Sequence, residues 1–180
     1  MQFKIIAAQD LNEQQRQQIA DLCFSAFDED PWSQYTFMQK AVHIVGISDD
    51  QIVSHALWTD RTFTINGSLN VKTAYVEYVT TDYTMRGKGL ASQLLRHLVD
   101  VLTNLEYGLA ALQPEDEAFY RKLGWTSWWG DLYIKQDTST YVTNDYEIML
   151  YPLSVHMKNL LSHRSEENTI CAEWREGEVW

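Results

Sequence analysis

The chain has 180 residues, of which 45% are hydrophobic, 13% aromatic and only three proline, as in a globular domain with a core rather than a disordered chain. Lys and Arg total 14 against 25 Asp and Glu, and the net charge of −11 disfavours a nucleic-acid partner. It favours a cationic partner, although acidity can also serve solubility alone. No apolar run reaches the ~18 residues of a transmembrane helix, and no secretory signal is recognisable. The isolated Cys23 and Cys171 indicate reduced thiols and a cytoplasmic protein.

The first half of the chain predicts short strands and two helices. A strand over residues 3–7 precedes a helix that the run 10–13 would begin as a capping box, with apolar residues at helical spacing behind it. The acidic run 28–30 ends this helix, and a short second helix is predicted over 33–39. Turn signals at Asp49-Asp50 and Asn66-Gly67 separate the strands that follow, which are predicted over residues 42–47, 52–59, 63–65 and 69–81.

The second half begins with the most amphipathic helix, predicted from residue 86 to about residue 105. A short buried strand over 108–112 follows, and Pro114 would begin a helix that ends before Gly124. Late strands are predicted over 126–129 and 147–150, with a polar loop or irregular hairpin over 130–144. The residues after Pro152 have no periodicity that places them. Taken alone, the order of elements indicates only a mixed α/β fold.

A glycine-rich run, Met85 to Ala91, joins the strand 69–81 to the amphipathic helix. Glycines at such a turn let backbone N–H groups approach phosphate oxygens, and the helix N-terminus adds unpaired donors. Arg86 and Lys88 add positive charge in an acidic chain. A polyanionic cofactor is therefore predicted here, and the plainer interpretation is a turn before a helix. The run fits neither G-x-x-x-x-G-K-[ST] nor G-x-G-x-x-G.

Residues 86–91 fit the pattern R-x-x-G-x-A and resemble the acyl-CoA loop of the GCN5-related N-acetyltransferases, the GNAT superfamily. The run A-F-Y-R-K-L-G-W at 118–125 resembles a second signature of that superfamily, in the expected order and at a similar spacing. The resemblance implies a single α/β (α+β) domain over 1–180. Its mixed, mostly antiparallel sheet would be splayed between strands 4 and 5, with helices on both faces and acetyl-CoA in the splay.

Two further runs narrow the resemblance: A-Y-V-E-Y-V at 74–79 and C-A-E-W-R-E-G-E-V-W at 171–180 look like those of the aminoglycoside 2′-N-acetyltransferases. The implied function is acetyl transfer from acetyl-CoA to the 2′-amine of an aminoglycoside, conferring resistance, with residues 153–180 contributing to the substrate site. Gln113 to Asp116 and Glu178 depart from the family pattern, which leaves the range of drugs open. The alternatives are a polyamine or other metabolite amine as acceptor, or a catalytically silent acyl-CoA or drug-binding module. Homodimer formation is also left open.

The resemblance assigns roles to individual residues. Glu77 would take the amine proton through water, and Tyr120 would act as the acid for the departing thiolate. The backbone of Val79 and Thr81 would hold the pantetheine arm. The pyrophosphate would meet the loop residues Arg86, Gly87, Lys88, Gly89, Leu90 and Ala91. The substrate would meet Asp28, Asp30, Trp32, Asp145, Glu178 and Trp180, the last of these through its carboxylate.

Each of these residues also has a plainer interpretation as a strand, core or solvated residue. No metal is expected, because the five histidines lack a ligand spacing, and packing or surface roles are predicted for them. Neither cysteine lies in a motif, so transfer should be direct, without an acyl-enzyme. The sequence does not decide between core and site for Trp128 and Trp129.

Overall fold

The structure, a computed structural model, describes residues 1–34, 36–165, 167–176 and 179–180. They form two compact units, each made of two chain segments. Unit 1 comprises Met1–Thr59 and Val76–Asp100, and unit 2 comprises Asp60–Tyr75 and Val101–Trp180.

Helices separate single strands and runs of consecutive strands along the chain. Their bounds are Gln2–Ala7 (β1), Val42–Ser48 (β2), Gln51–Ile65 (β3), Leu69–Thr81 (β4), Leu109–Leu112 (β5), Thr126–Ser127 (β6), Asp131–Gln136 (β7), Ser139–Val142 (β8), Met149–Pro152 (β9) and Thr169–Glu173 (β10). Hydrogen-bonded neighbours follow the order β6-β9-β5-β4-β3-β10-β7-β8, with β2 on β3 and β1 on β2. The β4–β5 and β7–β10 pairs are parallel. Antiparallel pairing joins β1–β2, β2–β3, β3–β10, β5–β9, β6–β9 and β7–β8. The mixed, mostly antiparallel sheet is thus confirmed.

The helices are Glu13–Phe27 (α1), Pro31–Gln34 (α2), Leu90–Asn104 (α3), Glu117–Arg121 (α4) and Val155–Ser162 (α5), with 3₁₀ turns at Ala8–Asp10 (η1), Thr36–Lys40 (η2) and Tyr83–Met85 (η3). The predicted starts of α1 and α4 are wrong. The capping box of α1 joins Asn12 and Gln15, whose side chains each accept the other's backbone N–H. α4 begins at Glu117 rather than at Pro114, and Asp116 caps it by accepting from the backbone N–H of Phe119. In both cases a side chain that accepts a backbone N–H of the first turn fixes the start of the helix.

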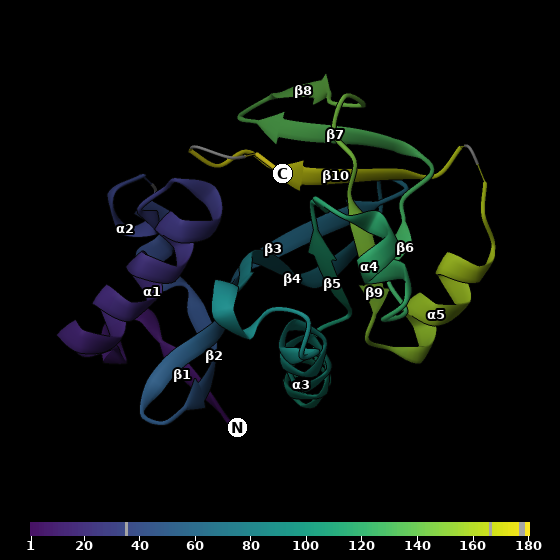
Figure 1. Ribbon diagram of the computed structural model, residues 1–180. Helices are drawn as coiled ribbons and strands as arrows, with labels where there is room; N and C mark the ends of the chain where they lie inside the picture. The colour runs from purple at the N-terminus through teal and green to yellow at the C-terminus, as the bar shows by residue number, and fades with distance from the viewer. Residues whose placement is uncertain (35, 166, 177–178) are drawn as a thin grey trace. The chain divides into compact units, whose positions relative to one another are not determined.

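In unit 1, α1 packs its apolar face against β2 and the start of β3 (Figure 1). Ile19, Leu22 and Cys23 recur at helical spacing and are buried together with Val45 and Ile52. The turn Asp49-Asp50 has both φ angles positive, which suits a two-residue hairpin. The hairpin is irregular, because its register shifts between Gly46 and Ile47.

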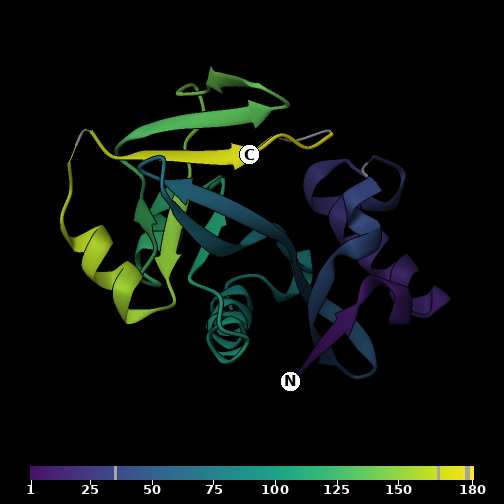
Figure 2. The same ribbon diagram turned by 180° about the vertical axis from the view of Figure 1, so that it is seen from behind.

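In unit 2, the residues after Pro152, which the sequence left unplaced, form α5 and β10. Ser154 begins α5 by accepting from the Met157 backbone N–H at 3.2 Å. β10 lies between β3 and β7, and β7, β8 and β10 run side by side (Figure 2). The polar stretch 130–144 is confirmed as a hairpin, formed by β7 and β8. The two short strands predicted over 52–59 and 63–65 are one continuous strand, β3, because Asp60 to Thr62 stay extended.

Trp180 belongs to the core of unit 2. Its side chain is 2% exposed, its Nε1 donates to Thr143 Oγ1 at 2.8 Å, and its ring meets the edge of Phe63 at 5.6 Å between centroids. The Arg61 guanidinium lies over the same ring at 5.8 Å and donates to the Val179 carbonyl oxygen. The indole is therefore part of the packed interior of unit 2, and the contact of the Trp180 carboxylate with the substrate stays a prediction.

Candidate active site

The β4 strand is paired with β5 over only part of its length. The parallel ladder of β4 with β5 runs from the Thr73–Leu109 pair to the Tyr75–Ala111 pair, whereas β4 continues to Thr81. The strand therefore has a paired half in unit 2 and a second half, Val76 to Thr81, in unit 1. The predicted splay between strands 4 and 5 falls at this point.

Tyr78 interrupts β4 with a left-handed backbone, at φ +53. A large side chain seldom occupies this region, and the strain persists where contacts fix the residue. The Tyr78 hydroxyl donates to Glu29 Oε2 at 3.2 Å, its carbonyl oxygen accepts from His55 Nδ1 at 3.2 Å, and its ring meets Phe27 edge-on at 5.6 Å. The two-residue period of β4 is therefore interrupted at Tyr78.

The predicted base and the pantetheine contacts lie around this kink. Glu77 and Val79 are half-buried on either side of Tyr78, and Thr81 is buried at the end of β4. The Thr81 carbonyl oxygen accepts from Arg86 Nε at 3.2 Å, so the loop arginine braces the strand end. The structure thus brings these residues together with the glycine loop within unit 1.

The glycine loop precedes α3 as a turn, because the helix begins at Leu90 rather than at residue 86. Gly87 and Gly89 both have left-handed backbones, at φ +76 and +74. A Cβ on Gly87 would meet nothing within 4 Å, and one on Gly89 only the Gln93 amide at 4.0 Å. Arg86 and Lys88 are exposed beside this open space. With the unpaired N–H groups of the first turn of α3, the loop has the space, donors and charge that a pyrophosphate needs.

The Gly89→Val variant is expected to weaken acetyl-CoA binding by about tenfold or more, since one charge-assisted hydrogen bond contributes roughly 1.5–3 kcal/mol. Valine at φ +74 also strains the backbone. Gly67→Val, at φ +68 in an exposed turn of unit 2, is the matched control for this strain. Calorimetric titration with acetyl-CoA should separate the two variants. Equal dissociation constants for wild type and Gly89→Val would contradict the assignment of the loop.

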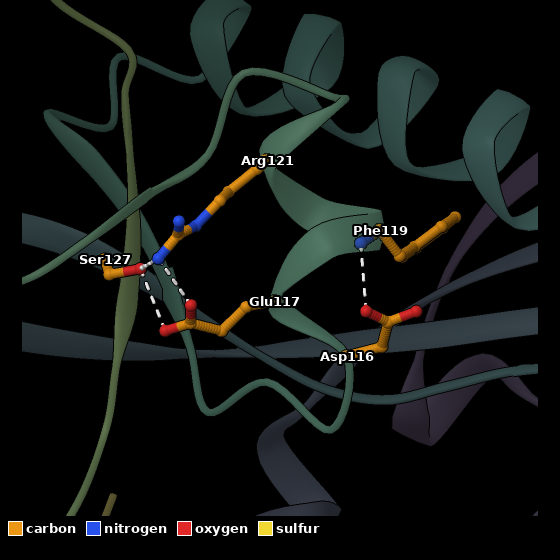
Figure 3. Close-up of polar contacts among 5 residues, drawn as sticks. All are labelled: Asp116, Glu117, Phe119, Arg121 and Ser127. Carbon is orange, nitrogen blue, oxygen red and sulfur yellow. Dashed lines mark hydrogen bonds and ion pairs between the residues drawn. The ribbon is translucent and has the colours of Figure 1, made fainter.

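Tyr120 lies on α4, which is fastened at both ends (Figure 3). The Glu117 carboxylate accepts from Ser127 Oγ at 2.9 Å and pairs with Arg121, which fixes α4 against β6. Tyr120 is 9% exposed between the rings of Phe119 and Trp125. Burial, followed by the nearby Glu115 and Asp116, raises the pKa of its phenol well above the usual 10. The phenol therefore keeps its proton throughout the neutral range.

Three of the predicted substrate residues lie in unit 1, from the end of α1 to the start of α2. Asp28 is exposed and ends α1 with φ +58. Asp30 is exposed and accepts from the Trp32 backbone N–H at 3.0 Å. Trp32 is half-buried, its Nε1 donates to the Arg16 carbonyl oxygen at 3.2 Å, and the Arg16 guanidinium covers its ring at 5.0 Å. The acidic pair is thus at the surface, while the indole is largely engaged by α1.

The remaining predicted substrate residues belong to the second half of the chain. Asp145 is exposed, and Glu178 lies outside the described residues. The neighbours of Asp145 line a cavity of about 180 Å³ in unit 2. The lining residues are Trp128, Trp129, Gly130, Leu132, Asn144, Tyr146, Glu147 and Ile148. The tryptophan pair that the sequence left undecided therefore lines this cavity and also packs against the core of unit 2.

A buried histidine pair in unit 1 was not singled out from the sequence. His43 and His55 are both 0% exposed, and His43 Nδ1 lies 2.9 Å from His55 Nε2. Burial, followed by Arg16, lowers the pKa of His43 to about 4, and burial and His43 lower that of His55. The Cys23 thiol beside them has its pKa raised to about 12 by burial, Asp30 and Glu29, which makes it a poor nucleophile. Within the described ranges, no group of three or more His, Cys, Asp or Glu side chains could hold a metal ion.

Acid should destabilise the protein through His43. Between pH 6.5 and about 4 the unfolded chain binds a proton at this residue that the folded chain does not, so stability present above pH 6.5 is lost as the pH falls. The loss should reach about 2–3 kcal/mol by about pH 4.5. Urea unfolding at neutral and acid pH should therefore show a smaller acid loss for His43→Gln than for wild type. His156→Gln, an exposed site, is the control, and equal losses in wild type and His43→Gln would refute the assignment.

Comparison with known families identifies the class of protein that this fold and site define. Residues 4–127 match the family described as the acetyltransferase (GNAT) domain, a stretch that includes β4, the glycine loop and α4. The chain therefore belongs to the GNAT acetyltransferase family, whose reaction is acyl transfer from an acyl-CoA to an amine. Comparison with curated proteins gives no match. No helix among the described residues is long and apolar enough to cross a membrane.

Solved structures share the fold at low sequence identity. A GNAT family N-acetyltransferase (YhbS) from Escherichia coli in complex with CoA matches with a TM-score of 0.64 at 16% identity, over 97% of this chain and 89% of that one. The ribosomal-protein-S18-alanine N-acetyltransferase from Escherichia coli matches with a TM-score of 0.56 at 18% identity, over 86% of this chain and 96% of that one. A probable N-acyltransferase from Enterococcus faecalis V583 matches with a TM-score of 0.59 at 19% identity over 69% of this chain, which spans only 32% of that protein.

Proposed function

We propose that this chain transfers the acetyl group of acetyl-CoA to the 2′-amine of an aminoglycoside. The observation that carries the acetyl-CoA part is the pair of left-handed glycines, with open space around them, directly before α3. A pyrophosphate would lie against this turn, with Arg86 and Lys88 beside it. The pantetheine arm would follow the second half of β4, where Val79 and Thr81 offer backbone groups.

The proposed reaction is direct. The neutral 2′-amine attacks the thioester carbonyl carbon, the C–N bond forms, and the C–S bond breaks as the thiolate leaves. The proton that the nitrogen loses passes through water to Glu77. The Tyr120 phenol donates a hydrogen bond and a proton to the sulfur and regains a proton from solvent. Because the pKa of Tyr120 is raised above that of a thiol near 8.5, the hydrogen bond contributes more than complete proton transfer.

Replacing Tyr120 with Phe is expected to lower kcat by about tenfold, less than the usual 10²–10⁴-fold of general-acid catalysis, since water can protonate the sulfur in part. The dissociation constant of acetyl-CoA should change little. Tyr151→Phe removes a hydroxyl from a half-buried neighbour of Trp125 and serves as the control. Steady-state kinetics of both variants test this, and wild-type turnover in Tyr120→Phe would remove the assigned role.

The acceptor is proposed from charge and from the C-terminal run. A net charge of −11 raises the local concentration of a polycation, and exposed carboxylates lie in both units, at Asp28 and Asp30 in unit 1 and at Asp145 and Glu147 in unit 2. The run 171–180 resembles that of aminoglycoside 2′-N-acetyltransferases. Such a substrate carries several ammonium groups, which a strongly acidic chain attracts.

A thiol-release assay with a panel of amines tests the proposal. Turnover with aminoglycosides that bear a 2′-amine, and none with 2′-hydroxyl analogues, is the expected result. Turnover only with polyamines would replace the acceptor, and tight acetyl-CoA binding without any turnover would indicate a binding module. Expression of the chain in a susceptible bacterium should raise the inhibitory concentration of the drugs that bear a 2′-amine and leave that of the 2′-hydroxyl analogues unchanged.

A further inference from the structure

The buried histidines of unit 1 face one another because of the irregular β2–β3 hairpin. Next to the turn, Ile47 pairs with Ile52, and this register continued would set His43 opposite Ala56. The shift at Gly46 pairs His43 with Leu57 and His55 with Val45 instead. Since a shift of one residue reverses the face of every later side chain, His43 and His55 are brought to one face. There His43 Nδ1 and His55 Nε2 are 2.9 Å apart.

The hydrogen-bond partners determine which ring nitrogens carry protons. The Tyr78 carbonyl oxygen can only accept, so His55 Nδ1, at 3.2 Å, must carry the proton that it donates. A neutral imidazole has one donor and one acceptor, so His55 Nε2 accepts and His43 Nδ1 donates to it. Both rings are neutral, because their pKa values lie far below 7. His43 Nε2 is then a buried acceptor with no hydrogen-bond partner in the part of the chain that the structure describes.

The histidine pair is hydrogen-bonded, through His55, to Tyr78, the strained residue of β4. Tyr78 has φ +53, a backbone state that costs roughly 1–3 kcal/mol in a non-glycine residue and needs support from its surroundings. His55 fixes its carbonyl oxygen, and Glu29 accepts from its hydroxyl. Glu77 precedes Tyr78 directly, so the dihedral angles of Tyr78 set the direction of the strand on which Glu77 and Val79 lie.

We propose that His55, oriented by His43, is a positioning residue that holds the left-handed kink at Tyr78 and thereby aims Glu77 at the acceptor amine. The functional half of this inference rests on the proposed acetyl transfer. The structural half, the Nδ1-protonated pair and the fixed Tyr78 carbonyl, does not depend on it.

Two substitutions separate the two hydrogen bonds of His55. In His55→Asn the amide nitrogen takes the place of Nδ1 and can donate to the Tyr78 carbonyl, while the contact with His43 is lost. In His55→Gln the longer amide takes the place of Nε2 and can accept from His43, while the Tyr78 bond is lost. Each variant leaves one buried hydrogen-bonding partner unsatisfied, which costs about 1–3 kcal/mol. The two variants should therefore lose similar amounts of stability.

The expected result is that kcat falls about tenfold in His55→Gln and stays within about threefold of wild type in His55→Asn, because one hydrogen bond of about 1.4 kcal/mol corresponds to tenfold. The calorimetric dissociation constant of CoA should be unchanged in both. Nitrogen-15 NMR of the wild-type rings should find the proton on Nδ1 of both histidines. The backbone chemical shifts of Tyr78, which report φ, should be preserved in His55→Asn and altered in His55→Gln.

A proton on Nε2 of His55 would overturn the proposal. Equal losses of kcat in the two variants, explained by their lower melting temperatures alone, would overturn it as well. If the wild-type chain acetylates no amine, the proposed function fails. The tautomers and the Tyr78 shifts then still decide whether His55 holds the kink.

Discussion

Glu77→Gln is expected to lower kcat/KM for the acceptor by about 10²-fold or more, within the 10²–10⁴ range of general-base effects. The amide keeps the size of the side chain but cannot take the proton that the amine loses on attack. Acetyl-CoA should bind as in wild type, because Glu77 lies on β4 before the pantetheine contacts at Val79 and Thr81. Steady-state kinetics with an aminoglycoside, together with calorimetric titration of acetyl-CoA, check both parts.

The pH profile sharpens this test. In wild type, kcat/KM should rise with pH as more of the acceptor amine becomes neutral. In Glu77→Gln the activity should approach that of wild type only at high pH, where solvent hydroxide takes the proton. Glu13→Gln, an exposed change at the start of α1, is the matched control. Wild-type turnover of Glu77→Gln from about pH 6 to 9 would exclude Glu77 as the base.

Trp180→Ala is expected to destabilise unit 2 by about 3–5 kcal/mol, the usual cost of removing a large buried aromatic side chain. The indole is 2% exposed and contacts Phe63, Arg61 and Thr143, so its loss leaves both a cavity and an unpaired hydroxyl. Denaturant unfolding followed by tryptophan fluorescence or circular dichroism measures the change.

Trp174→Ala is the matched control, because this tryptophan is 46% exposed in the segment that follows β10. It should cost no more than about 1 kcal/mol. A change at Trp180 that raised only the KM for the aminoglycoside, at unaltered stability, would favour the substrate contact expected from sequence over the core position found in the structure.

The elements that carry their own local signals could be predicted from the sequence. The Asn66-Gly67 turn and the apolar stripe of α1 are specified by residues within a few positions of one another, and the structure contains both. The glycine loop belongs to this group, since its left-handed backbone is what two glycines permit. The predicted start of α3 at residue 86 is wrong, because the glycine loop before Leu90 is a turn and not part of the helix.

The histidine pair and the kink of β4 could not be predicted in this way. The pairing of His43 with His55 depends on a register shift at Gly46, and the two-residue turn alone would place the rings on opposite faces. Tyr78 has no local preference for φ +53 and is held there by Glu29 and His55, which are distant in sequence. The position of β10 depends likewise on pairing with β3 and β7 rather than on the pattern of its five residues.

The central claim, acetyl transfer to the 2′-amine, is tested most directly by the structure of the product. The protein would be incubated with acetyl-CoA and an aminoglycoside that bears amines at the 2′ and other positions, and the product would be examined by mass spectrometry and NMR. The account predicts one added acetyl group, with its amide carbonyl coupled to the proton at the 2′ carbon. An acetyl group on any other nitrogen, or unmodified drug after complete incubation, would contradict it.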